Sequence, residues 1–231
     1  MSTPINKRDI SIILPAYNEN AVIRTVVEEL VSGGYRVIVV DDGSETPLDS
    51  VLENLSVYLL RHEVNLGQGA AIQTGIEFAS EKNIQYIITF DGDGQHDAAD
   101  IEKILQPLVS GKADIVFGSR FMKGAVQDMP AKRKYLLQIA RYLNFFFTGL
   151  LLTDAHNGLR AMTKNAAAKL NIRENGMAHA TELLIQVKKN KLRYAEIPVN
   201  IRYTEYSRGK GQTIWSGFRV FFDLLLNKIF K

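Results

Sequence analysis

Short, uninterrupted apolar runs recur along the first half of the chain, and a helical pattern separates each run from the next. Residues 10–14 (ISIIL), 37–40 (VIVV) and 86–90 (YIITF) are such runs. A strand that is apolar at every residue must be covered on both faces, which is typical of a parallel sheet between two layers of helices. The alternation therefore predicts an α/β fold with a mostly parallel central sheet.

The pattern also predicts the order of the elements. The expected strands of the first half cover residues 10–14, 37–40, 57–60, 86–90 and 115–118. The helices expected there cover residues 20–32, 47–54, 69–82 and 98–110. Beyond them we expect a basic loop at 123–134, an apolar helix at 135–151, a turn at 153–158, helices at 165–170 and 178–190, short strands within 192–203 and a helix at 213–229. Ligands of such sheets bind beyond the carboxyl ends of the strands, so the polar segments there are the candidate site.

Charge divides the chain into two halves. Residues 1–120 carry 9 Lys and Arg against 18 Asp and Glu, whereas residues 121–231 carry 19 against 7. An acidic half suits cations and a basic half suits phosphates or an anionic membrane, although solvated surfaces have the same composition. The length of 231 residues fits one continuous domain made of these two halves. The absence of cysteine excludes a disulfide framework and any Cys-ligated metal site.

Two carboxylates follow the fourth apolar run directly. Asp91 and Asp93 are separated only by Gly92, whose flexibility permits a tight turn. On such a turn both carboxylates can face one hard cation, and Mg²⁺ or Mn²⁺ suits oxygen ligands of this kind. Gln95 or His96 could add a further ligand.

Two other motif interpretations of this region are disfavoured, and a solvated turn stays open. An EF-hand loop is disfavoured because His96 stands where glycine is needed and a strand precedes the motif in place of a helix. A dinucleotide fingerprint at Gly67 and Gly69 is disfavoured because Ile72 stands in place of the third glycine. A solvated turn remains an equal alternative as long as the motif is considered alone.

A second carboxylate cluster, Asp41-Asp42-Gly43-Ser44, follows the second apolar run. Its carboxylates can accept hydrogen bonds from a ribose hydroxyl or from the N–H of a base. Considered alone, the segment is equally typical of a turn in which Gly43 takes a positive φ.

Five short motifs in this order resemble the family 2 glycosyltransferases, which have the GT-A fold. They are residues 13–19 (ILPAYNE), 39–44 (VVDDGS), 65–67 (NLG), 91–93 (DGD) and 118–120 (GSR). Within that family the chain is most similar to the dolichyl- and polyprenyl-phosphate sugar transferases. Residues 91–96 (DGDGQH) resemble their metal motif, and residues 153–160 (TDAHNGLR) resemble their S-D-x-x-S-G-F-R segment. The resemblance covers residues 10–205.

The resemblance implies a role for each matched position. The nucleotide-sugar donor would contact Pro15, Tyr17, Glu19, Asp41, Asp42, Gly67, Asp91 and Gly92, with Asp42 at the base. Asp91, Asp93 and Gln95 would hold Mg²⁺ or Mn²⁺ on the diphosphate, where the ion offsets the repulsion between carboxylates and phosphates. Arg120 would contact a phosphate, and the reaction would be a single inverting displacement. Residues 1–120 would thus bind the donor and residues 121–231 the acceptor.

The acceptor remains open between two classes. A lipid phosphate is already ionised and needs cations rather than a base, for which the candidates are Arg133, Arg160, Arg202, Arg208 and Lys210. A sugar hydroxyl on a growing glycan needs a base, and Glu182 is the plausible one. Glu182 is equally typical of a carboxylate at a helix N-terminus. The polar segment 203–211 resembles a loop that closes over the site, but it departs from the G-x-S-K-like pattern of the lipid-phosphate group.

The expected helix at 213–229 has an apolar face with basic flanks, so it suits either a membrane surface or a protein partner. The sequence shows no signal peptide and no apolar run long enough to span a bilayer, so we expect a cytoplasmic or peripheral membrane enzyme. Nucleic acid is not an expected partner because no recognition motif accompanies the basic half. The sequence leaves a homo-oligomer open, and also a non-catalytic nucleotide-binding subunit, although the paired Asp91 and Asp93 disfavour the latter.

Overall fold

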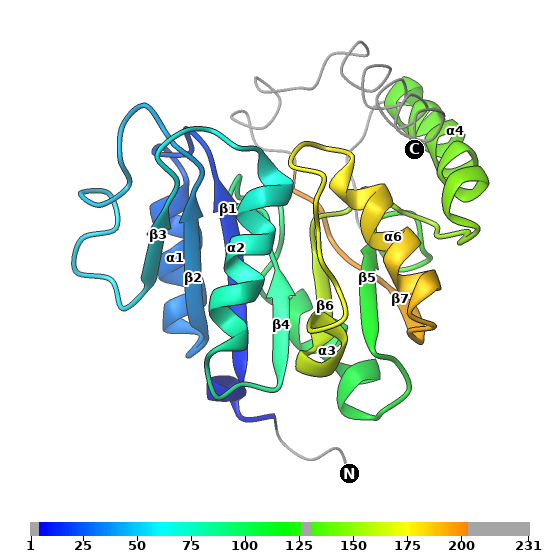
Figure 1. The fold of residues 1–231 in the computed structure, drawn as a ribbon, viewed down its shortest axis with the longest axis horizontal. Coiled ribbons are helices and arrows are strands. Elements are labelled where there is room, and N and C mark those ends of the chain that lie inside the picture. Colours follow the sequence, from blue (N-terminus) through cyan, green and yellow to red (C-terminus); the bar gives the residue numbers. More distant parts are fainter. Residues whose placement is uncertain (1–4, 126–130, 203–231) are drawn as a thin grey trace.

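The computed structural model describes residues 5–125 and 131–202, and of residues 131–134 and 136 it describes the backbone alone. A seven-stranded sheet forms its centre, with helices on both faces (Figure 1). In sheet order the strands are β3 (Tyr58–Arg61), β2 (Arg36–Asp41), β1 (Ile10–Ala16), β4 (Tyr86–Thr89), β6 (Arg160–Thr163), β5 (Ile115–Ser119) and β7 (Tyr194–Pro198). The helices are η1 (Lys7–Asp9), α1 (Ile23–Ser32), α2 (Gln68–Ser80), α3 (Asp100–Val109), α4 (Ala131–Thr148), α5 (Lys164–Ala167) and α6 (His179–Lys189).

Strand β1 shows why the sheet is double-covered. All seven of its residues are buried, so it has no solvent-facing side. Ile12 and Leu14 join the apolar cluster under α1 and α3, whereas Ile13 joins the cluster under α2, α5 and α6. Burying apolar side chains on both faces stabilises the sheet and confirms the architecture predicted from the continuous apolar runs.

The helix predicted at 47–54 is wrong. These residues form a succession of turns, with one helical hydrogen bond from the Leu52 N–H to the Leu48 carbonyl, and Asn54 adopts a φ of 65°. Leu48 and Leu52 are nevertheless buried in the core. A short segment containing Asp, Ser and Asn gains little from helix formation, because these side chains compete for backbone hydrogen bonds and nucleation is costly.

Strand β6 was not predicted. It lies between β4 and β5 and runs antiparallel to both, whereas the other strand pairs are parallel. Its four residues begin with Arg160 and lack the continuous apolar character of the other central strands. The sequence interpretation therefore placed only a turn at 153–158 and no strand after it.

Helix α4 begins earlier than predicted. The basic segment expected to be a loop up to residue 134 is helical from Ala131, and the helix ends at Thr148 rather than near 151. Arg133 therefore lies in a helix, although its side chain is not described. Among the described residues, no helix is both long and apolar enough to cross a membrane. Arg208, Lys210, the segment 203–211 and the expected helix 213–229 lie outside the described residues.

Candidate active site

A cavity of about 690 Å³ lies at the carboxyl edge of the sheet, where β1, β2, β4 and β5 end. Most of the residues singled out in the sequence line it. They are Pro15, Tyr17, Glu19, Asp42, Gly67, Asp91, Gly92, Asp93, Gln95, Arg120 and Arg160. The fold therefore brings together motifs that are up to 145 positions apart, from Pro15 to Arg160.

At one end of the cavity Asp42 is held by donors from three places. Its Oδ1 accepts hydrogen bonds from Nδ1 of His62 (2.8 Å) and the Leu66 N–H (3.0 Å), and its Oδ2 accepts the Gly67 N–H (2.7 Å). Gly67 has a φ of 109°, and a Cβ there would lie 2.3 Å from the carbonyl oxygen of Asn175. Only glycine permits this close approach, which aims the Gly67 N–H at Asp42.

Asp41 points away from this cavity and braces the adjoining turn. Its Oδ2 accepts from Nη1 of Arg61 (2.8 Å), and its Oδ1 accepts the Ser44 N–H (2.9 Å). The carboxylate is completely buried. Asp41 thus fixes the loop that carries Asp42, and it does not line the cavity.

The paired carboxylates Asp91 and Asp93 lie further along the cavity. Asp91 accepts hydrogen bonds from Nε2 of Gln68 (3.1 Å) and Nε2 of His96 (3.2 Å). Burial opposes ionisation of Asp91, but the His96 hydrogen bond and the positive charge of Arg160 outweigh it, so the pKa of Asp91 lies below its usual value.

Asp93 shows the opposite behaviour. Burial and the negative charge of Asp91 raise the pKa of Asp93 to about 6, although the Gln95 N–H donates to its Oδ1 (3.0 Å). Two carboxylates that repel each other in a shared cavity fit a divalent cation, because the ion removes the repulsion. No group of three or more Asp, Glu, His or Cys side chains is placed to hold a metal in the described part of the chain. The donor set matches Mg²⁺-type ions, which take few protein carboxylates and complete their shell with phosphate and water.

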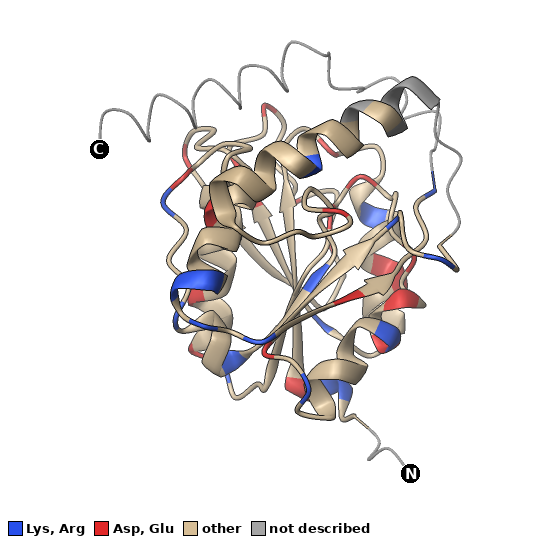
Figure 2. Cartoon of the chain, turned by 90° about the vertical axis from the view of Figure 1, so that its right-hand side faces the viewer, with Lys and Arg blue, Asp and Glu red and all other residues tan. Residues whose placement is uncertain are grey.

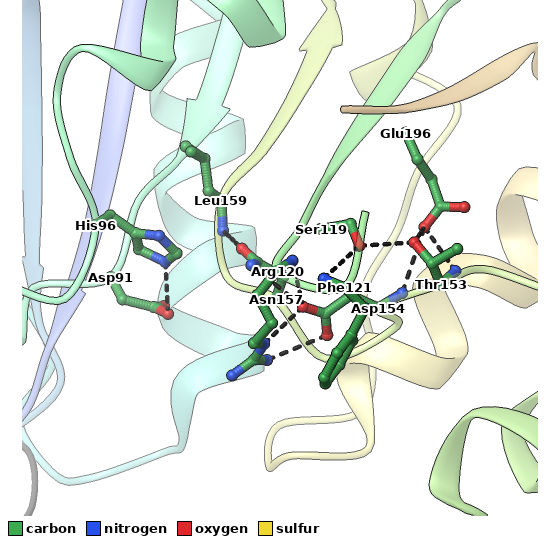
Figure 3. A network of polar contacts seen from close by, with 10 residues as sticks. All are labelled: Asp91, His96, Ser119, Arg120, Phe121, Thr153, Asp154, Asn157, Leu159 and Glu196. Atoms are coloured by element: carbon green, nitrogen blue, oxygen red, sulfur yellow. Dashed lines mark hydrogen bonds and ion pairs between the residues drawn. The ribbon is translucent and has the colours of Figure 1, made fainter. Parts of the chain in front are cut away.

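Arg120 faces the same cavity from the end of β5. Its Nε and Nη2 donate to the two oxygens of Asp154 (2.6 and 3.1 Å), and its backbone N–H donates to Asp154 as well (3.1 Å) (Figure 3). Asn157 donates to the same carboxylate (3.4 Å). The guanidinium plane is therefore fixed by a buried bidentate ion pair.

A further layer of hydrogen bonds holds Asp154 itself. Oε1 of Glu196 on β7 accepts from the Thr153 N–H (2.7 Å), the Thr153 hydroxyl (2.6 Å) and the Asp154 N–H (3.3 Å) (Figure 3). The Ser119 hydroxyl pairs with the Thr153 hydroxyl (2.6 Å). The turn at 153–154 is thereby tied to strands β5 and β7, so Arg120 is positioned by the sheet.

Arg160 is the second arginine of the cavity, and its surroundings differ. It is 3% exposed, and its Nε has no hydrogen-bond partner among the described residues. Burial lowers the pKa of Arg160, and the charges of Asp91 and Asp154 only partly oppose this effect. A buried cation without a hydrogen-bonded anion is costly, and it is suited to an anionic ligand that enters the cavity.

The model of glycosyl transferase family 2 matches residues 11–170, more than half of the chain. This chain is a family 2 glycosyltransferase. Its architecture is the GT-A fold, as the ordered motifs predicted.

Relatives match this glycosyltransferase over nearly its whole length. A UDP-N-acetylglucosamine–dolichyl-phosphate N-acetylglucosaminyltransferase of Methanococcus voltae is 35% identical over 96% of this chain and 97% of its own length. A dolichol-phosphate mannosyltransferase of Pyrococcus furiosus is 28% identical over 94% of this chain and 63% of its own. Glucosyl-3-phosphoglycerate synthase of Mycobacterium tuberculosis, solved with Mn²⁺, UDP and phosphoglyceric acid, has a TM-score of 0.70 at 20% identity, covering 95% of this chain and 78% of its own. This structural likeness shows the fold.

Some predicted site residues of the glycosyltransferase lie away from the cavity. The Glu182 carboxylate accepts the N–H groups of Arg173 (2.9 Å) and Glu174 (2.8 Å). Arg202 is exposed and pairs with Asp97 (2.5 Å). The geometry thus gives Glu182 a role in fixing a loop, and it gives Arg202 a partner outside the cavity.

The sequence interpretation missed Gln68 and His62. Gln68 donates to Asp91, and its position directly after the Asn-Leu-Gly motif is a signal that could have been used. His62 contacts Asp42 from 20 positions away, and no local pattern marks it.

His179 also lines the cavity, with a pKa lowered to about 4 by burial and by the charge of Arg160, so its ring is neutral near pH 7.

Proposed function

We propose that this glycosyltransferase moves a sugar, with inversion, from a nucleoside-diphosphate sugar to a polyprenyl phosphate. The observation that carries the proposal is the meeting of opposite charges in one cavity. Asp91 and Asp93 line the same cavity as Arg160, whose Nε has no partner among the described residues, while Asp154 holds Arg120 at that cavity. Such a site suits a divalent ion together with two phosphate groups.

The donor would lie along the cavity between Asp42 and Asp93. Asp42 would accept a hydrogen bond from the base, with Pro15 and Tyr17 lining the pocket beside it. Asp91, Asp93 and the Gln95 side chain would hold Mg²⁺ or Mn²⁺, which when bound stabilises the negative charge of the leaving diphosphate. The donor of the 35% identical M. voltae relative, UDP-N-acetylglucosamine, supports a UDP-linked sugar.

The acceptor phosphate would meet the arginines. A phosphate monoester is largely ionised near pH 7, so it can attack the anomeric carbon without a general base. The guanidinium groups of Arg120 and Arg160 would hold it beside the diphosphate, where two anions would otherwise repel each other. The position of Glu182 outside the cavity favours this acceptor over a sugar hydroxyl, which needs a base within hydrogen-bond reach.

Helix α4 supports a lipid-borne acceptor. Leu137 and Ala140 line the cavity, whereas Tyr135, Tyr142 and Phe146 on the same helix are 67%, 60% and 77% exposed. In Figure 2, α4 lies above the carboxyl edge of the sheet, and from Tyr135 to Thr148 the sequence of this helix contains a single charged residue, Arg141. Exposed aromatic side chains of this kind suit a membrane interface, where the lipid tail of the acceptor would remain.

The test is a two-substrate assay. The purified protein is incubated with Mn²⁺, polyprenyl phosphate in detergent and, in turn, UDP-, GDP- and dTDP-linked sugars. We expect one donor to give a lipid-linked sugar of inverted anomeric configuration. A panel in which no donor is bound, hydrolysed or transferred would contradict the proposal. Transfer to a glycan hydroxyl in preference to the lipid phosphate would overturn the acceptor assignment alone.

A further inference from the structure

His62 bridges two elements beside Asp42. The residue directly follows β3, and its Nδ1 lies 2.8 Å from Oδ1 of Asp42 while its Nε2 lies 3.0 Å from the hydroxyl of Thr74 on α2. The His62 side chain is only 11% exposed. The imidazole is therefore fixed at both nitrogens within the protein.

The partners determine which nitrogen of His62 donates. An ionised carboxylate only accepts, so Nδ1 must carry a proton and donate it to Asp42. In the neutral ring Nε2 then accepts a hydrogen bond from the Thr74 hydroxyl. Thr74 thus holds the ring in the orientation that keeps the Nδ1–H on Oδ1.

The hydrogen bonds to Asp42 leave it little further capacity. Oδ1 already accepts from His62 and from the Leu66 N–H, and Oδ2 accepts from the Gly67 N–H. A carboxylate offers about four acceptor positions, so one remains, and it is on Oδ2. Asp42 lines the cavity, which makes this position the one available to a ligand.

We infer that His62, oriented by Thr74, sets the nucleobase specificity of this glycosyltransferase by occupying Oδ1 of Asp42. The inference rests on the proposed function, in which Asp42 contacts the base of the donor. Uracil presents a single N–H on its pairing edge, which one acceptor satisfies. Guanine presents two adjacent N–H donors on that edge, and a carboxylate pairs with both only when both of its oxygens are available. The filled Oδ1 therefore favours uridine nucleotides over guanosine nucleotides.

Calorimetric titration with UDP and GDP in the presence of Mn²⁺ tests the inference. For the wild-type protein we expect UDP to bind at least about tenfold more tightly than GDP, because one of the two guanine N–H groups would remain without an acceptor. His62→Phe keeps a ring but removes the donor, so Oδ1 becomes available and the preference for UDP should fall about tenfold or more. His62→Asn restores an N–H near the position of Nδ1 and should restore the preference.

The outcomes for the wild-type protein and for His62→Phe separate the inference from the proposed function. Equal wild-type affinities for UDP and GDP, or an unchanged preference for UDP in folded His62→Phe, would overturn the inference and leave the proposed function standing. If the wild-type protein bound neither UDP nor GDP, that result would instead contradict the proposed function. If His62→Phe does not fold, Thr74→Val takes its place. This substitution removes the hydrogen bond that orients the His62 ring and leaves the side chains of His62 and Asp42 themselves unchanged. A Thr74→Val protein with the full wild-type preference would then overturn the inference.

Discussion

The two ends of the cavity are built on opposite principles. At the base end, three donors of the protein occupy all but one of the roughly four acceptor positions of the Asp42 carboxylate before any ligand binds. At the phosphate end, Asp91 and Asp93 repel each other, and Nε of Arg160 has no partner in the described part of the chain. The base end is therefore preorganised for recognition, whereas the phosphate end is complete only with the charges that substrates and a metal would bring.

Arg120 marks the boundary between these two principles. Its guanidinium belongs to the phosphate end, yet Asp154 and the Glu196–Thr153 contacts fix it as firmly as His62 fixes Asp42. Asp154 therefore orients the Arg120 guanidinium before any ligand binds, whereas Nε of Arg160 has no hydrogen-bond partner among the described residues. Both arginines can contact a phosphate, but only Arg120 is held in place by an ion pair of the protein.

The largest expected effect follows from Asp93→Asn. Removing one of two repelling carboxylates weakens the metal site, so we expect sugar transfer to fall by about three orders of magnitude or more. The same change relieves repulsion, so the midpoint of thermal unfolding should stay constant or rise. Initial rates and a thermal melt measure the two effects, and Glu102→Gln, an exposed carboxylate on α3, is the matched control. If Asp93→Asn kept nearly wild-type turnover, Asp93 would not be a ligand of a metal that the reaction needs.

The two arginines should respond differently to substitution by methionine. Arg120→Met leaves Asp154 as a buried, unpaired charge, which costs about 3–5 kcal/mol of unfolding free energy. Arg160→Met removes a buried cation whose Nε lacks a partner among the described residues, so the unfolding free energy should stay constant or rise while transfer falls about a hundredfold. Urea unfolding and acceptor kinetics test both variants. Equal destabilisation by the two substitutions would show that Arg120 and Arg160 have the same structural role.

At the base end, Asp42→Asn should act on donor binding alone. The amide presents an NH₂ group where the carboxylate accepted hydrogen bonds, so at least one donor of the protein loses its partner. We expect KM for the nucleotide sugar to rise about thirtyfold with kcat little changed, which corresponds to about 2 kcal/mol of binding. A comparable loss in kcat would show that the base end takes part in the chemical step.

The metal-free protein should show a pH dependence of stability, which affects neither substrate binding nor turnover directly. Because the pKa of Asp93 is raised from 3.8 to about 6, the folded protein binds this proton more tightly than the unfolded chain does. The contribution is fully present below about pH 4 and is lost as the pH rises through 6, by on the order of 2 kcal/mol. The lowered pKa of Asp91 acts with the opposite sign and below this window. Denaturant unfolding of the wild type and Asp93→Asn at pH 4 and pH 7 isolates the effect, and identical pH slopes would contradict it.

The sequence predicted those parts of the molecule that depend on local pattern. The continuous apolar runs at 10–14, 37–40 and 86–90 predicted central strands, because burial on both faces leaves a signature in each strand itself. The prediction of a helix at 47–54 was wrong because the two leucines of this segment can be buried equally well by a succession of turns. Strand β6 escaped prediction because its placement depends on β4 and β5, its neighbours in the sheet.

The candidate site divides in the same way. The residues at strand ends, such as Asp42 and Asp91, stand in compact motifs and were predicted to face one cavity, which they do. The residues that orient them do not, since His62 lies 20 positions from Asp42, and Asp154 lies 34 from Arg120. Such pairs come into contact only in the folded protein, so no local spacing in the sequence indicates them.

A metal and the phosphates of the donor together would complete the phosphate end of the cavity. The most direct measurement is the affinity for UDP with and without Mn²⁺, in the wild-type protein and in Asp93→Asn. We predict that Mn²⁺ tightens UDP binding to the wild type by about a hundredfold and leaves Asp93→Asn nearly unchanged, a coupling of about 3 kcal/mol. Wild-type affinity for UDP that is the same in the presence and absence of Mn²⁺ would contradict the account.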